Sequence, residues 1–291
     1  MRFCIFTDLH YDMIPDGDRR IQALLRDCIS RKVDFILELG DLCHPTAENR
    51  RILQMFAEAG IPVYFSLGNH NTDFCPEHTA LEFLGLASGH YSFVKDNVKF
   101  IVLHASEPDA LHTGVSIPYE QLCWLEQELA DDRYFYIICT HQSLANDFVT
   151  AKGKARGILN RAEVRAILER RNAEKTRVLL CLNGHEHGSV VNIINGIPYY
   201  TLNSASYFWQ GVCPMYPYGP EIHQRYPYLK NMVLYREALH SIVTVDTSGV
   251  LTVEGMRGHY LTVGPQDIGM EPVWNGVSVL PETLSWNMQN L

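Results

Sequence analysis

Side chains that can bind a divalent metal ion follow five apolar, strand-like runs of this chain. The runs cover residues 2–7, 33–39, 62–67, 134–140 and 177–182, and they lead to Asp8-Leu9-His10, Gly40-Asp41, Gly68-Asn69-His70, His141 and Gly184-His185-Glu186-His187. In an open α/β sheet, sites form just outside the carboxyl ends of parallel strands. One such group alone would mean little, but five in succession predict a single cleft that is lined by Asp, His and Asn.

These side chains suit two hard or borderline divalent ions, which prefer carboxylate, imidazole and amide ligands. We expect Asp41 to bridge the ions, because its Gly-Asp turn lies centrally among the strand ends. The other expected ligands are Asp8, His10 and His187 for one ion, and Asn69, His141 and His185 for the second. Two neighbouring ions clamp a phosphoryl group and lower the pKa of a shared water, which gives hydroxide near neutral pH for attack on phosphorus.

The composition is ordinary for a globular enzyme. Of 291 residues, 46% are apolar and 20% are charged, which is sufficient for a large core. The net charge of −9 argues against a protein that binds nucleic acid through its phosphate backbone, because such binding needs a basic surface. A small phosphorylated substrate, for example a nucleotide, is compatible with this charge, because metal ions set the local field. The oligomeric state stays open.

Cysteine use and the start of the chain bear on the compartment. The 8 cysteines stand singly, without a CxxC pair, which is typical of a reduced intracellular protein. The first residues enter a strand without the pattern of a signal peptide. No apolar stretch is long enough to span a membrane. We therefore expect a cytoplasmic protein with no membrane partner.

Segments with helical periodicity alternate with the strand-like runs. They predict helices over residues 19–31, 49–59, 77–84, 118–132 and 160–171. The last helix starts with the pattern of a capping box, Asn160 to Glu163. The alternation up to about residue 75 predicts parallel strands with right-handed crossovers. Hairpins are expected for 91–93 with 99–103, and for 232–235 with 241–245, followed by a strand at 251–254.

Taken in order, the five metal-binding groups resemble the motifs of the calcineurin-like metallophosphoesterases. The resemblance covers Asp8-x-His10, Gly40-Asp41, Gly68-Asn69-His70, His141 and Gly184-His185-x-His187, within roughly residues 1 to 255. It implies an α/β fold, namely a four-layer α/β/β/α sandwich with two mixed sheets and a dinuclear metal site at the carboxyl ends of the strands. It also implies the ligand assignment given above. We expect a metallophosphoesterase domain over 1–260 and a C-terminal tail, 261–291, that packs on the same domain.

The resemblance assigns the catalytic role to His70, which would stabilise the transition state or protonate the leaving oxygen beside the metals. The family usually has an acidic residue after this histidine, but here Asn71 follows it, and Asp73 is a candidate substitute. His44, shortly after the Gly-Asp motif, is also unusual for the family and would touch substrate or simply be solvated. We include His44 and Asn71 among the candidate substrate-binding residues.

Two further stretches bear on specificity. The loop 146–159 contains Lys152 and Arg156, which would steer a phosphate towards the metals or would simply be solvated. The run 199–228 is rich in aromatic side chains. These would stack a nucleobase beside the site, or would pack the tail or a dimer interface.

The resemblance implies a metal-dependent phosphoric ester hydrolase that uses a hydroxide between the metals. Family tendency and the aromatic run favour a phosphodiesterase or a nucleotide diphosphate hydrolase. The alternative on the same site is a phosphomonoesterase, including a protein phosphatase. An alternative from another class is a non-catalytic interaction module, but such proteins lose ligands, whereas every expected position is filled here. The ligand types favour Mn or Fe, with Zn as a further option.

Overall fold

The computed structural model describes residues 1–108, 114–145, 157–210, 218–274 and 276–288. Lys152 and Arg156 lie outside these ranges. Two mixed six-stranded sheets form the centre of the molecule.

The first sheet has the strand order β18-β15-β14-β1-β2-β3. Its strands are β1 (Arg2–Phe6), β2 (Phe35–Glu38), β3 (Val63–Phe65), β14 (Ser241–Val245), β15 (Leu251–Glu254) and β18 (Trp286–Asn287). The strands β1, β2 and β3 are parallel, as the sequence predicts, and the remaining pairs are antiparallel.

The second sheet has the order β10-β11-β9-β8-β5-β4. Its strands are β4 (Tyr91–Lys95), β5 (Val98–Val102), β8 (Phe135–Cys139), β9 (Val178–Asn183), β10 (Val190–Ile194) and β11 (Ile197–Thr201). The central strands β5, β8, β9 and β11 are parallel, and the two edge strands are antiparallel. The hairpin predicted around Asp96-Asn97 is confirmed as β4 and β5.

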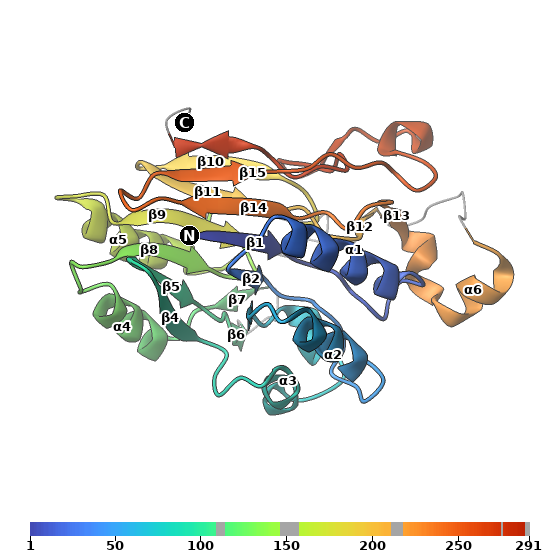
Figure 1. The fold of residues 1–291 in the computed structure, drawn as a ribbon, viewed down its shortest axis with the longest axis horizontal. Helices are drawn as coiled ribbons and strands as arrows, with labels where there is room; N and C mark the ends of the chain where they lie inside the picture. Colours follow the sequence, from blue (N-terminus) through green and yellow to red (C-terminus); the bar gives the residue numbers. More distant parts are fainter. Residues whose placement is uncertain (109–113, 146–156, 211–217, 275, 289–291) are drawn as a thin grey trace.

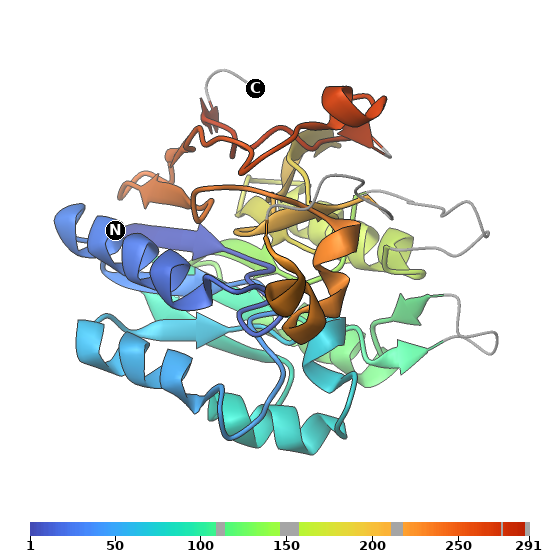
Figure 2. The ribbon, with the colours of Figure 1, turned by 90° about the vertical axis from the view of Figure 1, so that its right-hand side faces the viewer.

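Helices cover the outer face of each sheet, so the predicted four-layer sandwich is confirmed (Figures 1 and 2). The helices on the first sheet are α1 (Gly17–Ser30), α2 (Arg50–Ala59) and α3 (Glu77–Leu84), and those on the second are α4 (Tyr119–Glu128) and α5 (Arg161–Asn172). Figure 2 shows the blue helices α1 and α2 on one side of the strands and the yellow-green α5 on the other.

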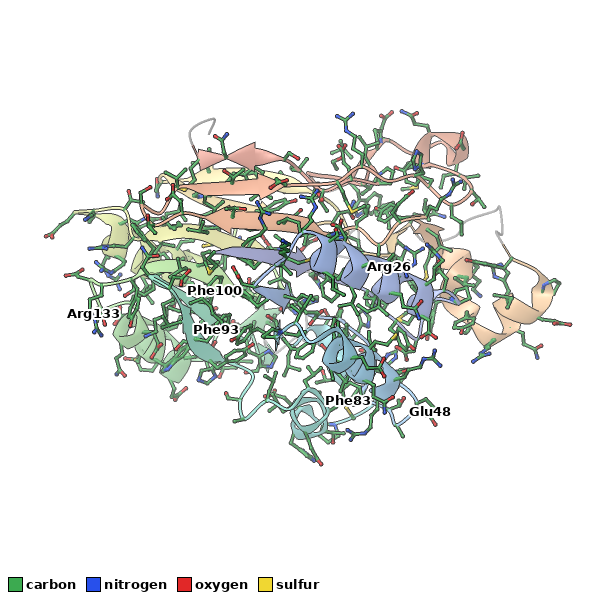
Figure 3. All side chains as sticks on the ribbon, viewed as in Figure 1. Arg26, Glu48, Phe83, Phe93, Phe100 and Arg133 are labelled. Atoms are coloured by element: carbon green, nitrogen blue, oxygen red, sulfur yellow. The ribbon has the colours of Figure 1, made fainter. Side chains whose placement is uncertain are left out.

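The layers follow from the two-residue period of the strands. In β1, Cys4 and Phe6 face the helices α1 and α2, whereas Phe3 and Ile5 face the second sheet. Between the sheets, Phe100 of β5 lies edge-on to Phe3, at 5.2 Å between ring centroids, and stacks on Phe93 at 4.8 Å (Figure 3). The central strands of each sheet, such as β2 and β9, are therefore buried on both faces.

One predicted strand pairing is wrong. The strand β13 (Met232–Leu234) pairs with β12 (Tyr207–Trp209) in a separate two-stranded sheet, whereas β14 pairs with β1 and β15. Burial explains the choice, because β14 completes the first sheet, while β13 carries Met232 and Leu234 into a small cluster around Ile14.

The other elements are short. They are β6 (Glu107–Pro108), β7 (Val115–Ser116), α6 (Pro220–Arg225), β16 (Val273–Trp274), β17 (Val277–Ser278) and the 3₁₀ helices η1 (Asn69–Thr72), η2 (Pro227–Asn231) and η3 (Pro265–Ile268). None of the helices within the described ranges combines the length and apolar character that crossing a membrane requires.

Candidate metal centre

The predicted ligands come together at one edge of the two sheets. Asp8, Asp41 and Asn69 follow β1, β2 and β3 of the first sheet, and His141 and His185 follow β8 and β9 of the second. Two groups of three potential ligands form there, Asp8 with His10 and His187, and Asp41 with His141 and His185. Within each group the ligand atoms lie within 4.8 Å of one another.

Asp41 belongs to the second group and also lies near the first. Its Oδ2 is 3.1 Å from His141 Nε2 and 3.9 Å from His10 Nε2. Its Oδ1 accepts a hydrogen bond of 2.8 Å from the backbone N–H of His70, which leaves Oδ2 directed at the imidazoles. This position fits a carboxylate that bridges two ions.

Several buried oxygen and nitrogen atoms of the site are arranged as ligands of cations. Asp8 Oδ1 and Asn69 Oδ1 are buried without a hydrogen-bond partner among the described residues. Two histidines place Nδ1 against a backbone carbonyl oxygen, His141 at 2.9 Å from Leu39 and His187 at 2.8 Å from Tyr207. Such bonds leave Nε2 free for a metal. The Nε2 atoms of His187 and His10 face each other at 3.3 Å, which suits ions placed nearby.

The backbone at the ligands adopts an unusual conformation. Eight non-glycine residues within the described ranges have positive φ, and five of them are predicted ligands, namely Asp8, His10, Asp41, His185 and His187. Positive φ is unfavourable for residues with a Cβ and concentrates at functional sites. The fold therefore holds these five residues in place at a cost in backbone energy.

Glycines of the motifs leave room for the ligands. A Cβ at Gly68 would collide with the Asp41 carboxylate, and one at Gly184 would collide with Thr7 and Asp8. Gly40, at φ +106°, lies against the ring of His141. Each motif thus needs glycine because a ligand from another strand passes directly over it.

The turn after β11 supports the loop that carries Asp8 and His10. Ser204 Oγ donates to the carbonyl oxygen of Asp8 at 2.8 Å, and Ser206 Oγ donates to that of Leu9 at 2.7 Å. All these groups are buried. These bonds stabilise the positive-φ loop from behind.

A family model described as calcineurin-like phosphoesterase matches residues 1–189, well over half of the chain of 291 residues. The chain belongs to the calcineurin-like phosphoesterase family. The predicted resemblance is thereby confirmed, and the match spans all five metal-binding groups. A search of curated proteins found no match.

Solved structures share the fold of this phosphoesterase at low sequence identity. A dimetal phosphatase from Danio rerio is 13% identical, with a TM-score of 0.62, over 90% of this chain and 96% of that chain. A Plasmodium protein, described as the anchor in the inner membrane complex, is 14% identical, with a TM-score of 0.55, over 91% of this chain and 85% of that chain.

Family membership and geometry together give the chemistry of the site. This member of the calcineurin-like phosphoesterases is a phosphoester hydrolase with a dinuclear site for divalent metals, and the two neighbouring groups of potential ligands are the candidates to hold them. Its substrates are phosphorylated compounds.

His70 lies beside the ligands of the calcineurin-like centre, in η1. Its ring is 5.1 Å from that of His10, and its Nδ1 lies 2.5 Å from Asp73 Oδ2. Burial opposes the charged form, but the hydrogen bond to Asp73 and the negative charge of Asp41 outweigh it and raise the pKa of His70 above its ordinary value. Asp73, the residue directly after η1, thus places a carboxylate against the ring of His70.

The ligands of the phosphoesterase site interact strongly even without ions. Burial alone would raise the pKa of the Asp8 and Asp41 carboxyl groups, but the imidazoles of His187 and His141 hold both well below the usual range. For His141, burial favours the neutral ring, yet Asp41 at 3.1 Å raises its pKa to about 10. A metal that binds His141 Nε2 would therefore displace a proton from it.

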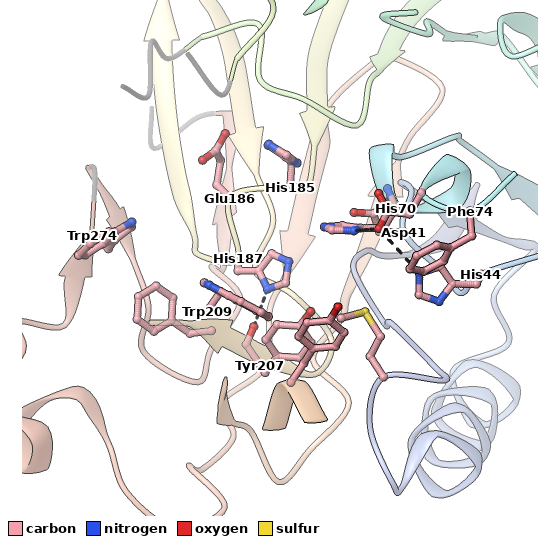
Figure 4. Close-up of a pocket in the computed structure, with 14 residues that line it drawn as sticks. Asp41, His44, His70, Phe74, His185, Glu186, His187, Tyr207, Trp209 and Trp274 are labelled. Carbon is pink, nitrogen blue, oxygen red and sulfur yellow. Dashed lines mark hydrogen bonds and ion pairs between the residues drawn. The ribbon is translucent and has the colours of Figure 1, made fainter. Parts of the chain in front are cut away.

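A pocket of about 400 Å³ opens beside the ligands. In Figure 4, His185 and His187 lie across it from Asp41 and His70. His44 also lines it, with Nδ1 2.7 Å from Asp12 Oδ2. Asn71 is buried instead, and its amide bonds the backbone of Asp41, Gly68 and Cys43. These bonds connect the loop after β2, which contains Asp41 and Cys43, to the loop after β3, which contains Gly68.

The aromatic run separates into two groups. Tyr207 is buried and its ring packs on His10 and His187, at 5.2 and 4.8 Å. Trp209 and Tyr228 line the pocket. Two further lining aromatics, Phe74 and Trp274, lie outside the run, and no periodicity in the sequence links them to the site. Only their exposure in the folded protein reveals them.

Proposed function

We propose that this phosphoesterase hydrolyses phosphodiesters or nucleotide diphosphates at a dinuclear metal site. The main observation that supports this proposal is the pair of potential ligand groups that meet at Asp41. We assign Asp8, His10 and His187 to one ion, Asn69, His141 and His185 to the other, and Asp41 to both. When bound, the two ions supply Lewis-acid activation of the phosphoryl group and of a water.

Mn and Fe are the metals that we propose, with Zn as an alternative, because carboxylate, imidazole and amide ligands suit all three.

We also propose a reducing, cytoplasmic compartment. The cysteines within the described ranges are free thiols, which supports this assignment.

His70 is the proposed catalytic residue. Its Nδ1 is held by Asp73, so its Nε2 is the nitrogen available to the leaving oxygen. The raised pKa of His70 favours the protonated ring, which can donate a proton to that oxygen. His44 lies 3.8 Å from the same Asp73 oxygen through its Nε2 and forms part of the wall that substrate would contact.

Space on two sides of the site supports a diester. The pocket of about 400 Å³ is lined by Asp41, His185 and His187. A second pocket, of about 320 Å³, is lined by Asn69 and by Gln142, which follows His141. A phosphodiester carries two organic groups, and each pocket has room for one.

The first experiment compares bis-p-nitrophenyl phosphate, p-nitrophenyl phosphate and a nucleotide diphosphate as substrates in Mn²⁺. We expect the native protein to hydrolyse the diester or the diphosphate faster than the monoester. On an alkyl phosphodiester, whose leaving group needs a proton, His70→Ala should lose about a hundredfold or more in kcat while it retains its metals, because a general acid contributes roughly 10²–10⁴-fold. His259→Ala is the matched control, since His259 is exposed and pairs with Glu237 outside the site.

A clear preference for the monoester would replace this proposal with a phosphomonoesterase. Native protein that holds two metals but hydrolyses none of these compounds would contradict the assignment of substrate class.

A further inference from the structure

Exposed aromatic side chains gather at the metal site. Within the described ranges, five large aromatic side chains are exposed, and four of them line the same pocket as His70 and Asp41. The four are Phe74 at 78% exposure, Tyr228 at 49%, Trp274 at 40% and Trp209 at 39%. Exposed apolar surface of this kind costs free energy in water, so its concentration in a concave site points to a ligand.

These four rings come from separate parts of the chain. Phe74 follows η1, Trp209 ends β12, Tyr228 lies in η2, and Trp274 lies in β16, beyond the residues that the family model matches. In Figure 4, Trp209 and Trp274 lie on the opposite side of the pocket from Phe74. The pocket therefore has aromatic rings on two sides, and the predicted ligands Asp41, His185 and His187 also line it.

Packing holds the rings on the tryptophan side in place. Trp209 contacts Tyr228, with 6.2 Å between ring centroids, and Trp274 lies edge-on to the buried Phe208 at 6.1 Å. The strand β17 next to Trp274 is anchored by the backbone pairing of Ser278 with Ser189, which lies just after the His185-x-His187 motif. Trp274 thus stands in a fixed relation to the metal ligands.

We infer that this aromatic pocket binds the nucleobase of a nucleoside that is esterified to the phosphoryl group. The inference rests on the proposed function and specifies one substituent of its substrate. Every nucleobase can stack on an aromatic side chain, because each has a flat π-face. The volume of about 400 Å³ falls within the range of small-molecule sites, about 300–1,000 Å³.

The charges of the pocket favour a base over a second phosphate. Among its lining residues that the structure describes, none is Lys or Arg, and the carboxylates of Glu186 and Asp73 are present. A planar base brings no negative charge, and its edge can hydrogen-bond the indole N–H groups of Trp209 and Trp274. A quaternary ammonium group is the competing occupant, because aromatic rings and carboxylates also attract cations.

The test is equilibrium dialysis of metal-loaded protein with adenosine, ribose and choline. Adenosine has no phosphoester, so its binding is independent of whether hydrolysis occurs. We expect adenosine to bind, and ribose and choline to bind far more weakly. Trp209→Leu and Trp274→Leu should each raise the Kd for adenosine about tenfold, whereas Trp209→Phe should recover part of the affinity. Trp124→Leu is the control, because Trp124 packs on His90 away from the pocket.

Choline binding without adenosine binding would overturn the inference in favour of a cation. Equal binding of adenosine and ribose, or unchanged affinity in both tryptophan variants, would overturn it as well. Hydrolysis of bis-p-nitrophenyl phosphate without any adenosine binding would refute the inference and leave the proposed function standing.

Discussion

At the scale of single residues, the side chain three positions after His70 holds the ring of this histidine. Asp73 contacts His70 Nδ1 at 2.5 Å, and η1 makes this contact possible because residues three apart lie on the same side of a 3₁₀ helix. The sequence suggested Asp73 as a substitute for the missing acidic neighbour. Its contact with the ring depends on the 3₁₀ turn, which the sequence pattern does not predict.

Asp73→Asn should therefore slow substrates whose leaving group needs a proton. We expect kcat for an alkyl phosphodiester to fall about tenfold or more, and kcat for a p-nitrophenyl diester to change little, since general-acid assistance matters most for poor leaving groups. The control is Glu77→Gln, because Glu77 pairs with His104 rather than His70. Equal losses on both substrates would assign Asp73 a structural role only.

Proton release is a second expectation at this scale. The pKa of His141 is raised to about 10 by Asp41, so the metal-free folded protein carries a proton there at pH 7.5. A metal that binds Nε2 must displace it, so we expect Mn²⁺ binding to release about one proton and to tighten as the pH rises. Calorimetry in two buffers with different ionisation enthalpies measures the release. His141→Asn should abolish it, and His259→Asn should not. Proton uptake on binding would contradict this account.

At the scale of elements, hydrophobic periodicity predicted most strands and helices, and the strand ends predicted which ligands meet. Partners set by tertiary packing were not predictable. The capping box at Asn160 is wrong, for example, because its side chain bonds both backbone groups of Ile117, at 2.9 Å each, instead of capping α5. Trp274 was missed for the same reason, since pairing distant in sequence brings its hairpin to the pocket.

The glycine of the last motif tests how tightly the strand ends are packed. A Cβ at Gly184 would collide with Thr7 and Asp8, so Gly184→Ala should displace the Asp8 loop. We expect a loss of about 1–3 kcal/mol in the free energy of unfolding, with a marked drop in retained metal. The control is Gly219→Ala, where nothing lies within 4 Å of the added Cβ. Denaturation and metal analysis of both variants measure the effect. Full metal content in Gly184→Ala would argue against Asp8 as a ligand.

At the scale of the whole molecule, the described residues 261–274 and 276–288 pack against the rest of the chain. The strand β18 extends the first sheet by pairing with β15, and Val277 and Val279 are buried against Phe208, Val233 and Tyr235. Asn203, in the turn that supports the Asp8 loop, donates to the carbonyl oxygen of Leu280 at 2.8 Å. We therefore propose that residues 261–291 belong to the domain and support the metal site.

A chain that stops after Tyr260 should consequently fail as a stable protein, not merely lose a peripheral tail. It would expose the edge of β15 and remove two fully buried valines, each worth roughly 1.5–3 kcal/mol, from a total stability of about 5–15 kcal/mol. It would also remove Trp274 and the carbonyl partner of Asn203. We expect insoluble or metal-poor protein, whereas a chain that stops after Met288 and keeps β18 should match the native melting temperature and metal content. A truncated protein that melts cooperatively at the native temperature and holds two metals would show that residues 1–260 fold alone, with the tail serving only the aromatic pocket.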